Sequence, residues 1–304
     1  MPPEGVKTLS HAQILRNEEF LHLIKIFTDL GIKKVRFTGG EPLVRKGFLN
    51  ILTETKKKFP DLELCLTTNG TLIENYLNEL VSLKIKKINI SLDSFSSKTY
   101  QEITGFDYFS KVINNLEKLL ATNFFEIKIN SVLSQNTLEE LPDFLNYFKN
   151  KKITLRFIEK MPFTKPDKSF EFLPTDLLIK KLEEQGKLIR NEKVDTQVAE
   201  MYDLIYKENF LIKIGIIPTM THKFCSKCNR LRLTADGSLK SCLHSLEEYN
   251  LKDLLRKEVG DEKIKKIIYK AMASKGKEHQ LDCLADDGGC FSLSNSRPMS
   301  KIGG

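Results

Sequence analysis

KVRFTGGEP, residues 34–42, joins an apolar strand pattern to a glycine turn. Residues 18–30 before it carry apolar side chains at helical spacing, and Gly31 ends that pattern. Residues 48–59 after it show a second helical pattern. Strands that alternate with helices pair in parallel, because a crossover helix returns the chain to the same edge of the sheet. The stretch therefore predicts one β/α unit of a parallel sheet.

The same alternation continues to about residue 160. We expect strands at 34–38, 62–67, 87–92, 126–133 and 154–158, with helices at 18–30, 48–59, 72–83, 108–121 and 138–148. So many β/α units predict part or all of a (β/α) barrel. Beyond Pro162 the pattern loosens, and we expect a helix at 176–184 capped by Thr175, a strand at 210–217, and helices at 251–257 and 262–273. The expected division is a barrel domain at 1–162 and a second domain at 163–304.

Polar and glycine residues follow the expected strands at one rim. They are Thr38-Gly39-Gly40-Glu41-Pro42, Thr67-Thr68-Asn69-Gly70, Ser91-Leu92-Asp93-Ser94, Lys128-Ile129-Asn130-Ser131 and Glu159-Lys160-Met161-Pro162. Each group alone is explained by turn chemistry. Together they mark the carboxyl ends of the strands, where parallel α/β folds keep their active sites. Gly39 and Gly40 leave backbone open to a ligand, and Glu41 offers a carboxylate to an amine.

Three basic residues, Arg36, Lys128 and Arg156, interrupt apolar strands. A buried cation needs an anionic partner, which is either an internal carboxylate or a bound phosphate. In a barrel these side chains could point into the lumen. The sequence contains no Walker A stretch and no G-x-G-x-x-G turn, so any nucleotide is held by other means.

FCSKCNRLRLTADGSLKSCL, residues 224–243, holds Cys225, Cys228 and Cys242 around Arg230 and Arg232. An Asp-Gly turn within it lets the third cysteine return toward the first two. Three thiolates suit an iron–sulfur cluster with one open iron, or a zinc site completed by His222 or His244. Buried thiols without a metal are the third interpretation. Spacing alone leaves zinc and iron–sulfur open.

The amino-acid composition limits the classes of protein to which this chain can belong. The 304 residues carry a net charge of +8, 40% hydrophobic and 29% charged residues, which is ordinary for a globular protein. The charge favours an anionic ligand, although many lysines lie on expected helix faces, and no nucleic-acid-binding pattern is present. We expect no membrane span and no secretory signal. Six cysteines fit a reducing compartment; Cys65 reads as a buried strand residue, and Cys283 and Cys290 are unassigned.

Taken together, these motifs resemble a known family. FTGGEPLVRKGF, LTTNGTLI, NISLDS, ITGFDYFSKV, KINSVL, LRFIEKMPF, the cysteine segment and the terminal IGG follow the order and spacing of the GTP 3′,8-cyclases. These are radical S-adenosylmethionine (SAM) enzymes of molybdenum cofactor biosynthesis. The resemblance implies an incomplete (β/α)6-type TIM barrel closed by a C-terminal cluster domain. It also implies two [4Fe–4S] clusters, cleavage of SAM to a 5′-deoxyadenosyl radical, and conversion of GTP to 3′,8-cyclo-7,8-dihydroguanosine triphosphate.

The resemblance also implies roles for individual residues. Cys225, Cys228 and Cys242 would hold the C-terminal cluster, whose open iron meets GTP. Arg36, Thr67, Lys128, Arg156, Arg230, Leu231 and Arg232 would contact GTP. Gly40, Ser91 and Met161 would contact SAM, with Glu41 near its amino group. Arg230, Arg232 and the terminal Gly303 and Gly304 would serve catalysis.

One departure from the family concerns the SAM-cleaving cluster. The family's C-x-x-x-C-x-Y-C motif does not occur in this sequence, which begins MPPEG where the family continues after its third cysteine. We therefore expect the first barrel strand to be missing, and the chain as written to hold only one cluster and to be inactive alone.

Two alternatives stay open. One is a radical SAM enzyme with an auxiliary cluster that acts on a peptide. The other is a non-catalytic zinc- or nucleotide-binding remnant. The family further implies a homodimer, a downstream cyclic pyranopterin monophosphate synthase, and either a bacterial cytoplasm or a mitochondrial matrix as location.

Overall fold

The computed structural model describes residues 9–161, 171–192 and 198–276. Its central feature is an 8-stranded sheet in the order β1-β2-β3-β4-β5-β8-β7-β6. The strands are β1 (Lys34–Phe37), β2 (Glu63–Thr68), β3 (Lys87–Ser91), β4 (Glu126–Val132), β5 (Ile153–Ile158), β6 (Gly186–Arg190), β7 (Glu200–Tyr206) and β8 (Phe210–Ile217). Strands β1 to β5 and β8 run parallel, and β7 and β6 continue the sheet antiparallel.

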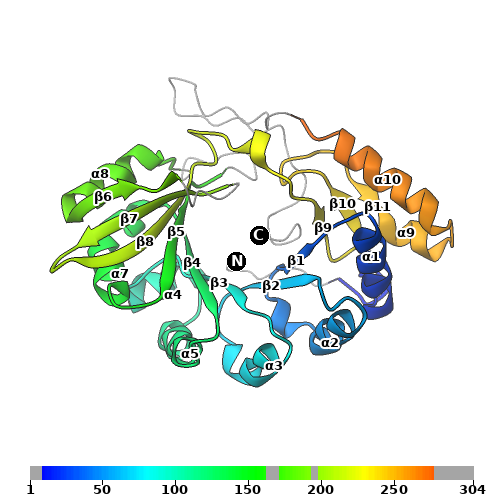
Figure 1. Cartoon of the computed structure of the whole chain (residues 1–304), viewed down its shortest axis with the longest axis horizontal. Coiled ribbons are helices and arrows are strands. Elements are labelled where there is room, and N and C mark those ends of the chain that lie inside the picture. The colour runs from blue at the N-terminus through cyan, green and yellow to red at the C-terminus, as the bar shows by residue number, and fades with distance from the viewer. Residues whose placement is uncertain (1–8, 162–170, 193–197, 277–304) are drawn as a thin grey trace.

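Figure 1 shows this sheet as an open arc with helices outside it. Within the described ranges the sheet does not close, since β1 bonds only to β2 and β6 only to β7. The helices of this part are α1 (Asn17–Asp29), η1 (Pro42–Val44), α2 (Phe48–Lys58), η2 (Ile73–Asn75), α3 (Leu77–Ser82), α4 (Ser97–Thr104), α5 (Phe109–Ala121), α6 (Gln135–Glu139), α7 (Leu141–Phe148) and α8 (Thr175–Gln185). This arrangement confirms the expected partial α/β barrel.

Alternation along the strands separates a packed face from a polar face. On β5, Ile153, Leu155 and Phe157 are buried in the main hydrophobic core, and the residues between them, Thr154 and Arg156, are only half-buried. Successive side chains of a strand point to opposite faces. Because the helices cover one face with apolar contacts, Arg156 projects to the concave face of the arc.

The C-terminal part forms a smaller layer against α1. It consists of η4 (Cys225–Lys227), β9 (Arg232–Leu233), β10 (Ser238–Lys240), β11 (Tyr249–Asn250), α9 (Leu251–Arg256) and α10 (Asp261–Ala273). A second core joins Leu23 and Ile26 of α1 to Leu239, Leu251 and Ile264. This layer, beside β1 in Figure 1, is thus anchored on the N-terminal helix.

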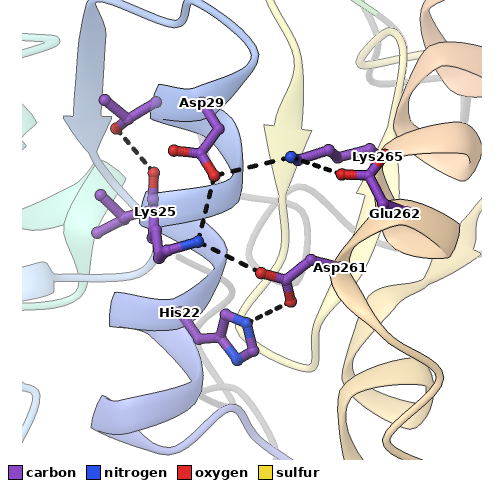
Figure 2. A network of polar contacts seen from close by, with 8 residues as sticks. His22, Lys25, Asp29, Asp261, Glu262 and Lys265 are labelled. Atoms are coloured by element: carbon purple, nitrogen blue, oxygen red, sulfur yellow. Dashed lines mark hydrogen bonds and ion pairs between the residues drawn. The ribbon is translucent and has the colours of Figure 1, made fainter.

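Charged residues surround that apolar contact. Figure 2 shows His22 and Lys25 of α1 meeting Asp261 of α10, at 2.7 Å and 3.4 Å, and Lys265 reaching Asp29 at 3.8 Å. On α9, the Arg256 guanidinium donates a hydrogen bond to the Glu19 carboxylate at 2.6 Å. Most of these side chains keep substantial solvent contact, and such exposed pairs contribute about 0–1 kcal/mol each. The network orients the two helices, while the second core provides most of the stabilisation.

Most expected elements lie within two residues of the observed ones, and three details are wrong. The helix expected at 72–83 is divided into η2 and α3, and the one expected at 138–148 is divided into α6 and α7. Thr175 was expected to cap a helix at 176–184, but α8 starts at Thr175 itself, after Pro174, with no side-chain cap. Its N–H is bonded instead by the Glu159 carboxylate, 2.9 Å away. The carboxylate of Glu159, which follows β5, thus takes the place of a local cap. Sequence reasoning also missed α4, the β6–β7 hairpin and the short strands β9 to β11.

The sheet continues beyond the expected boundary at residue 162. Strand β8 pairs with β5 in parallel, with Arg156 opposite Gly215. The cysteine segment therefore follows directly from a strand of the barrel sheet.

Candidate functional site

The carboxyl ends of β1 and β2 are fastened together by Glu41. Its Oε1 accepts hydrogen bonds from the Leu43 N–H at 3.1 Å and the Thr68 hydroxyl at 2.8 Å, and its Oε2 accepts from the Asn69 N–H at 2.7 Å. Burial raises the pKa of this carboxyl, and the three hydrogen bonds oppose that rise. Glu41 was expected near the SAM amino group; in the structure its oxygens already serve the turn that begins at Gly39.

Replacing Glu41 with alanine is expected to lower the free energy of unfolding by about 3 kcal/mol, since it strands two backbone donors and a hydroxyl. Chemical denaturation followed by circular dichroism measures this. Glu102→Ala, on the exposed side of α4, is the matched control and should change stability by less than about 0.5 kcal/mol. A stable Glu41→Ala variant would show that the carboxylate is held for ligand contact and not for the turn.

Three cations of the strands lie on the concave face. Arg36 of β1 donates from Nη1 to the Leu66 carbonyl at 2.8 Å and to Thr67 Oγ1 at 3.5 Å. Lys128 of β4 and Arg156 of β5 stand on neighbouring parallel strands, with Lys128 opposite Thr154 and Asn130 opposite Arg156. The expected lumen positions of these three residues agree with the alternation of their strands.

Gly215 on β8 makes room for one of them. A Cβ built there would lie 3.1 Å from Arg156 Cγ, closer than most Cβ contacts, so the arginine side chain would have to shift. Sequence reasoning did not single out Gly215. A glycine inside the apolar run Ile214–Ile217 was the available signal, because a strand glycine often marks close approach of another group.

Arg230 and Arg232, from the cysteine segment, complete one group of five cations. Burial, then Arg230, then Arg36 lower the pKa of Arg156 to about 10. Burial and then Arg230 lower the pKa of Arg232 to about 10, against the opposing effect of Cys242 and Cys228. The pKa of Lys128 is lowered by burial and by Arg156 and Arg36. The cations predicted to contact GTP thus lie close enough together on the concave face for their charges to lower one another's pKa values.

Arg230 differs from the others in its exposure. Its surface is open to solvent, yet the surrounding protein lowers its pKa. Both hold for a side chain on the concave face of the arc, where many protein atoms lie nearby and one side stays open. A ligand can therefore reach this guanidinium. Leu231, between the two arginines, is half-buried and packs against the second core.

The cysteines lie on a turn and at the end of a short strand. Cys225 begins η4, and the Cys228 N–H donates to the Cys225 carbonyl at 3.0 Å. Cys242 follows β10, which is joined to β9 by a turn at Gly237, where φ is 82° and a Cβ would lie 2.4 Å from Lys252 Cβ. This confirms the expected Asp-Gly turn.

Lys275, just after α10, contacts the cysteine segment through its ammonium group. Its Nζ donates to the Cys228 carbonyl at 2.5 Å and the Arg230 carbonyl at 3.0 Å, and lies 3.4 Å from Cys228 Sγ. No sequence signal pointed to it, because the contact spans 47 residues and one lysine among many carries no pattern.

The three thiols fit a soft metal or cluster in their chemistry. None of them forms a disulfide, all are half-buried, and the charges of Cys228 and Cys242 both act on Arg232. Within the described ranges, no three His, Cys, Asp or Glu side chains are gathered to hold a metal ion. The two candidate histidines have other neighbours: His244 Nε2 lies 3.4 Å from Met161 Sδ, and His222 Nδ1 lies 3.9 Å from Glu200 Oε1.

The residues expected to contact SAM share the same rim. Gly40 and Ser91 are exposed after β1 and at the end of β3, and Met161 is half-buried after β5. Met161 also meets His244, two residues beyond Cys242. Gly303, Gly304, Cys283 and Cys290 lie outside the described residues. Cys65 is a buried strand residue, as expected, with 0% of its surface exposed.

Comparison with known proteins shows the family of the chain. A model of the radical SAM superfamily matches residues 4–148, and one described as Molybdenum Cofactor Synthesis C matches residues 153–281. The GTP 3′,8-cyclase of Peptoclostridium acidaminophilum is 36% identical, over 100% of this chain and 90% of that protein. The chain belongs to the GTP 3′,8-cyclase family.

Other family members are similar over comparable lengths. The GTP 3′,8-cyclase of Desulforamulus reducens is 35% identical over 100% of this chain and 92% of its own length. That of Clostridium botulinum is 38% identical over 83% of this chain and 78% of its own. These relatives are bacterial, which does not favour the mitochondrial alternative. Within the described residues, no helix combines the length and the apolar character needed to cross a bilayer.

Solved structures are similar over part of the fold. A structure described as native anSMEcpe with bound AdoMet is 26% identical with a TM-score of 0.48, and covers 60% of this chain and 53% of its own. SuiB of Streptococcus suis is 20% identical, also with a TM-score of 0.48, over 56% and 39% of the two chains.

Proposed function

We propose that this GTP 3′,8-cyclase family chain binds GTP on the concave face of its sheet and serves SAM-dependent conversion of GTP to 3′,8-cyclo-7,8-dihydroguanosine triphosphate. The observation that carries the proposal is the group of five cations, Arg36, Lys128, Arg156, Arg230 and Arg232. Burial lowers the pKa of all five, and neighbouring cations lower it further in every one except Arg230. A triphosphate placed among them would relieve both costs, since it brings negative charge to the group.

Different residues are proposed to bind GTP and SAM. The arginines bind and orient the triphosphate, with Thr67 beside Arg36, and Lys128 adds a point charge. Cys225, Cys228 and Cys242 are the proposed ligands of the C-terminal cluster. Gly40, Ser91 and Met161 are the proposed SAM contacts at the rim, and Gly303 and Gly304 keep their proposed catalytic role. When bound, the family's clusters and SAM supply the radical and an open iron for the guanine.

Several expectations stay predictions. They include inactivity of the 304-residue chain alone, the homodimer, the downstream cyclic pyranopterin monophosphate synthase, a cytoplasmic location and the division at residue 162. A peptide-directed radical SAM enzyme is less favoured, because the relatives with full-length similarity are named for GTP.

Calorimetry tests the proposal directly. The anaerobically purified and reconstituted chain should bind GTP with a Kd in the micromolar range, and 1 M salt should weaken binding strongly, because the contacts are ionic. GTP should bind more tightly than guanosine, which lacks the triphosphate. Equal affinity for guanosine and GTP, or no heat with GTP, would contradict the proposal.

A further inference from the structure

A buried carboxylate at the end of β5 joins three segments of the chain. Glu159 is 1% exposed, and its Oε1 accepts hydrogen bonds from the Thr175 N–H at 2.9 Å and the Thr221 hydroxyl at 2.7 Å. Its Oε2 accepts from the N–H groups of Met220 at 2.7 Å and Thr221 at 3.0 Å. The Glu159 carbonyl accepts from the Thr219 hydroxyl at 3.1 Å. All its side-chain contacts are to donors within the protein.

These hydrogen bonds hold together, at one point, the two chain segments that lead to the SAM rim and to the cysteine segment. Toward the SAM rim, Met161 lies two residues after Glu159. Toward the cysteine segment, Thr221 lies four residues before Cys225. Met161 Sδ in turn lies 3.4 Å from His244 Nε2, beside the third cysteine. The carboxylate therefore couples the end of the barrel strand to the entry of the segment that carries Arg230 and Arg232.

We infer that Glu159 is a positioning residue, which sets the cysteine segment against the barrel rim by holding residues 219–221. The inference rests on the proposed function for its binding readout alone. Glu159 is not placed to react with a ligand, because its oxygens are enclosed and already accept four hydrogen bonds.

The amide variant separates its two tasks. In Glu159→Gln, the amide oxygen can take the place of Oε2 and keep the Met220 and Thr221 N–H groups. The amide NH₂ then faces the Thr221 hydroxyl, which can accept, and the Thr175 N–H, which cannot. The opposite orientation strands two backbone donors and is disfavoured. Glutamine should thus keep the loop and lose the contact to α8, whereas alanine loses both.

Two measurements on the reconstituted full chain test this inference. Hydrogen exchange should quicken at residues 219–228 in Glu159→Ala, and in Glu159→Gln only at the start of α8. Calorimetry should show GTP affinity reduced about tenfold in Glu159→Ala and within about threefold of the unchanged chain in Glu159→Gln. Leu116→Ala, at a fully buried position of α5, is the matched control for lowered stability.

The outcomes distinguish this inference from the proposed function. Unchanged exchange at residues 219–228 in Glu159→Ala overturns it, whether or not GTP binds. So does a loss of GTP affinity in Leu116→Ala as large as that in Glu159→Ala. If the unchanged chain binds no GTP, the proposed function fails while the exchange result still decides the role of Glu159. Should Glu159→Ala not fold, Thr221→Val removes one of the four contacts and should quicken exchange over the same residues.

Discussion

Arg230→Ala is expected to weaken GTP binding by about 100-fold, the effect of removing one charged partner from an ion pair in a concave site. The unliganded protein should behave differently. Arg230 lowers the pKa values of Arg36, Arg156 and Arg232, so it repels them when no anion is bound. We therefore expect the melting temperature of the unliganded variant to be equal to or higher than that of the unchanged chain.

This opposite sign distinguishes a binding residue from a structural one. The matched control is Arg190→Ala on the outer hairpin strand β6, where the guanidinium pairs with Glu200 at 2.9 Å. It should leave GTP affinity unchanged. Calorimetry and thermal unfolding, each with and without GTP, are the measurements. A fall in melting temperature for unliganded Arg230→Ala, with normal GTP affinity, would assign the arginine to the fold and remove it from the site.

Cys228→Ala is expected to abolish iron binding, from about four irons per reconstituted chain to none, because a cluster held by three thiolates loses one of its ligands. Cys65→Ala is the matched control. Burial raises the pKa of the Cys65 thiol, which keeps it protonated and therefore a poor ligand. Its replacement should leave the iron content unchanged.

Metal analysis and visible absorbance before and after dithionite distinguish the possible occupants of the cysteine segment. Absorbance that dithionite bleaches indicates a cluster. Zinc without iron in the unchanged chain would favour the remnant alternative over the cluster. About eight irons per chain would mean that further ligands lie outside the cysteine segment.

The barrel strands could be predicted because their runs of isoleucine and leucine interrupt a polar chain at regular intervals. The lumen cations could be predicted for a related reason: Arg36, Lys128 and Arg156 stand where an apolar residue would otherwise be expected. The strands β9 and β11 have two residues each, too few to show any period. Local patterns therefore identify the arc of the sheet and miss the short strands beside it.

The features that could not be predicted depend on hydrogen bonds between residues far apart in the sequence. Glu159 could be placed at the rim from sequence, but its partners Met220 and Thr221 lie 61 and 62 residues away. Glu41 looked available to a ligand, because nothing in its own turn reveals the Asn69 N–H that its carboxylate meets. Such contacts depend on tertiary structure and leave no periodic signal.

The second core has a consequence for biosynthesis. The apolar face of α1 leaves the ribosome more than 200 residues before α9 and α10, which cover it. At ordinary elongation rates it waits on the order of tens of seconds without its partner. Nascent chains should therefore depend on chaperones during this interval, until α9 and α10 cover the apolar face of α1.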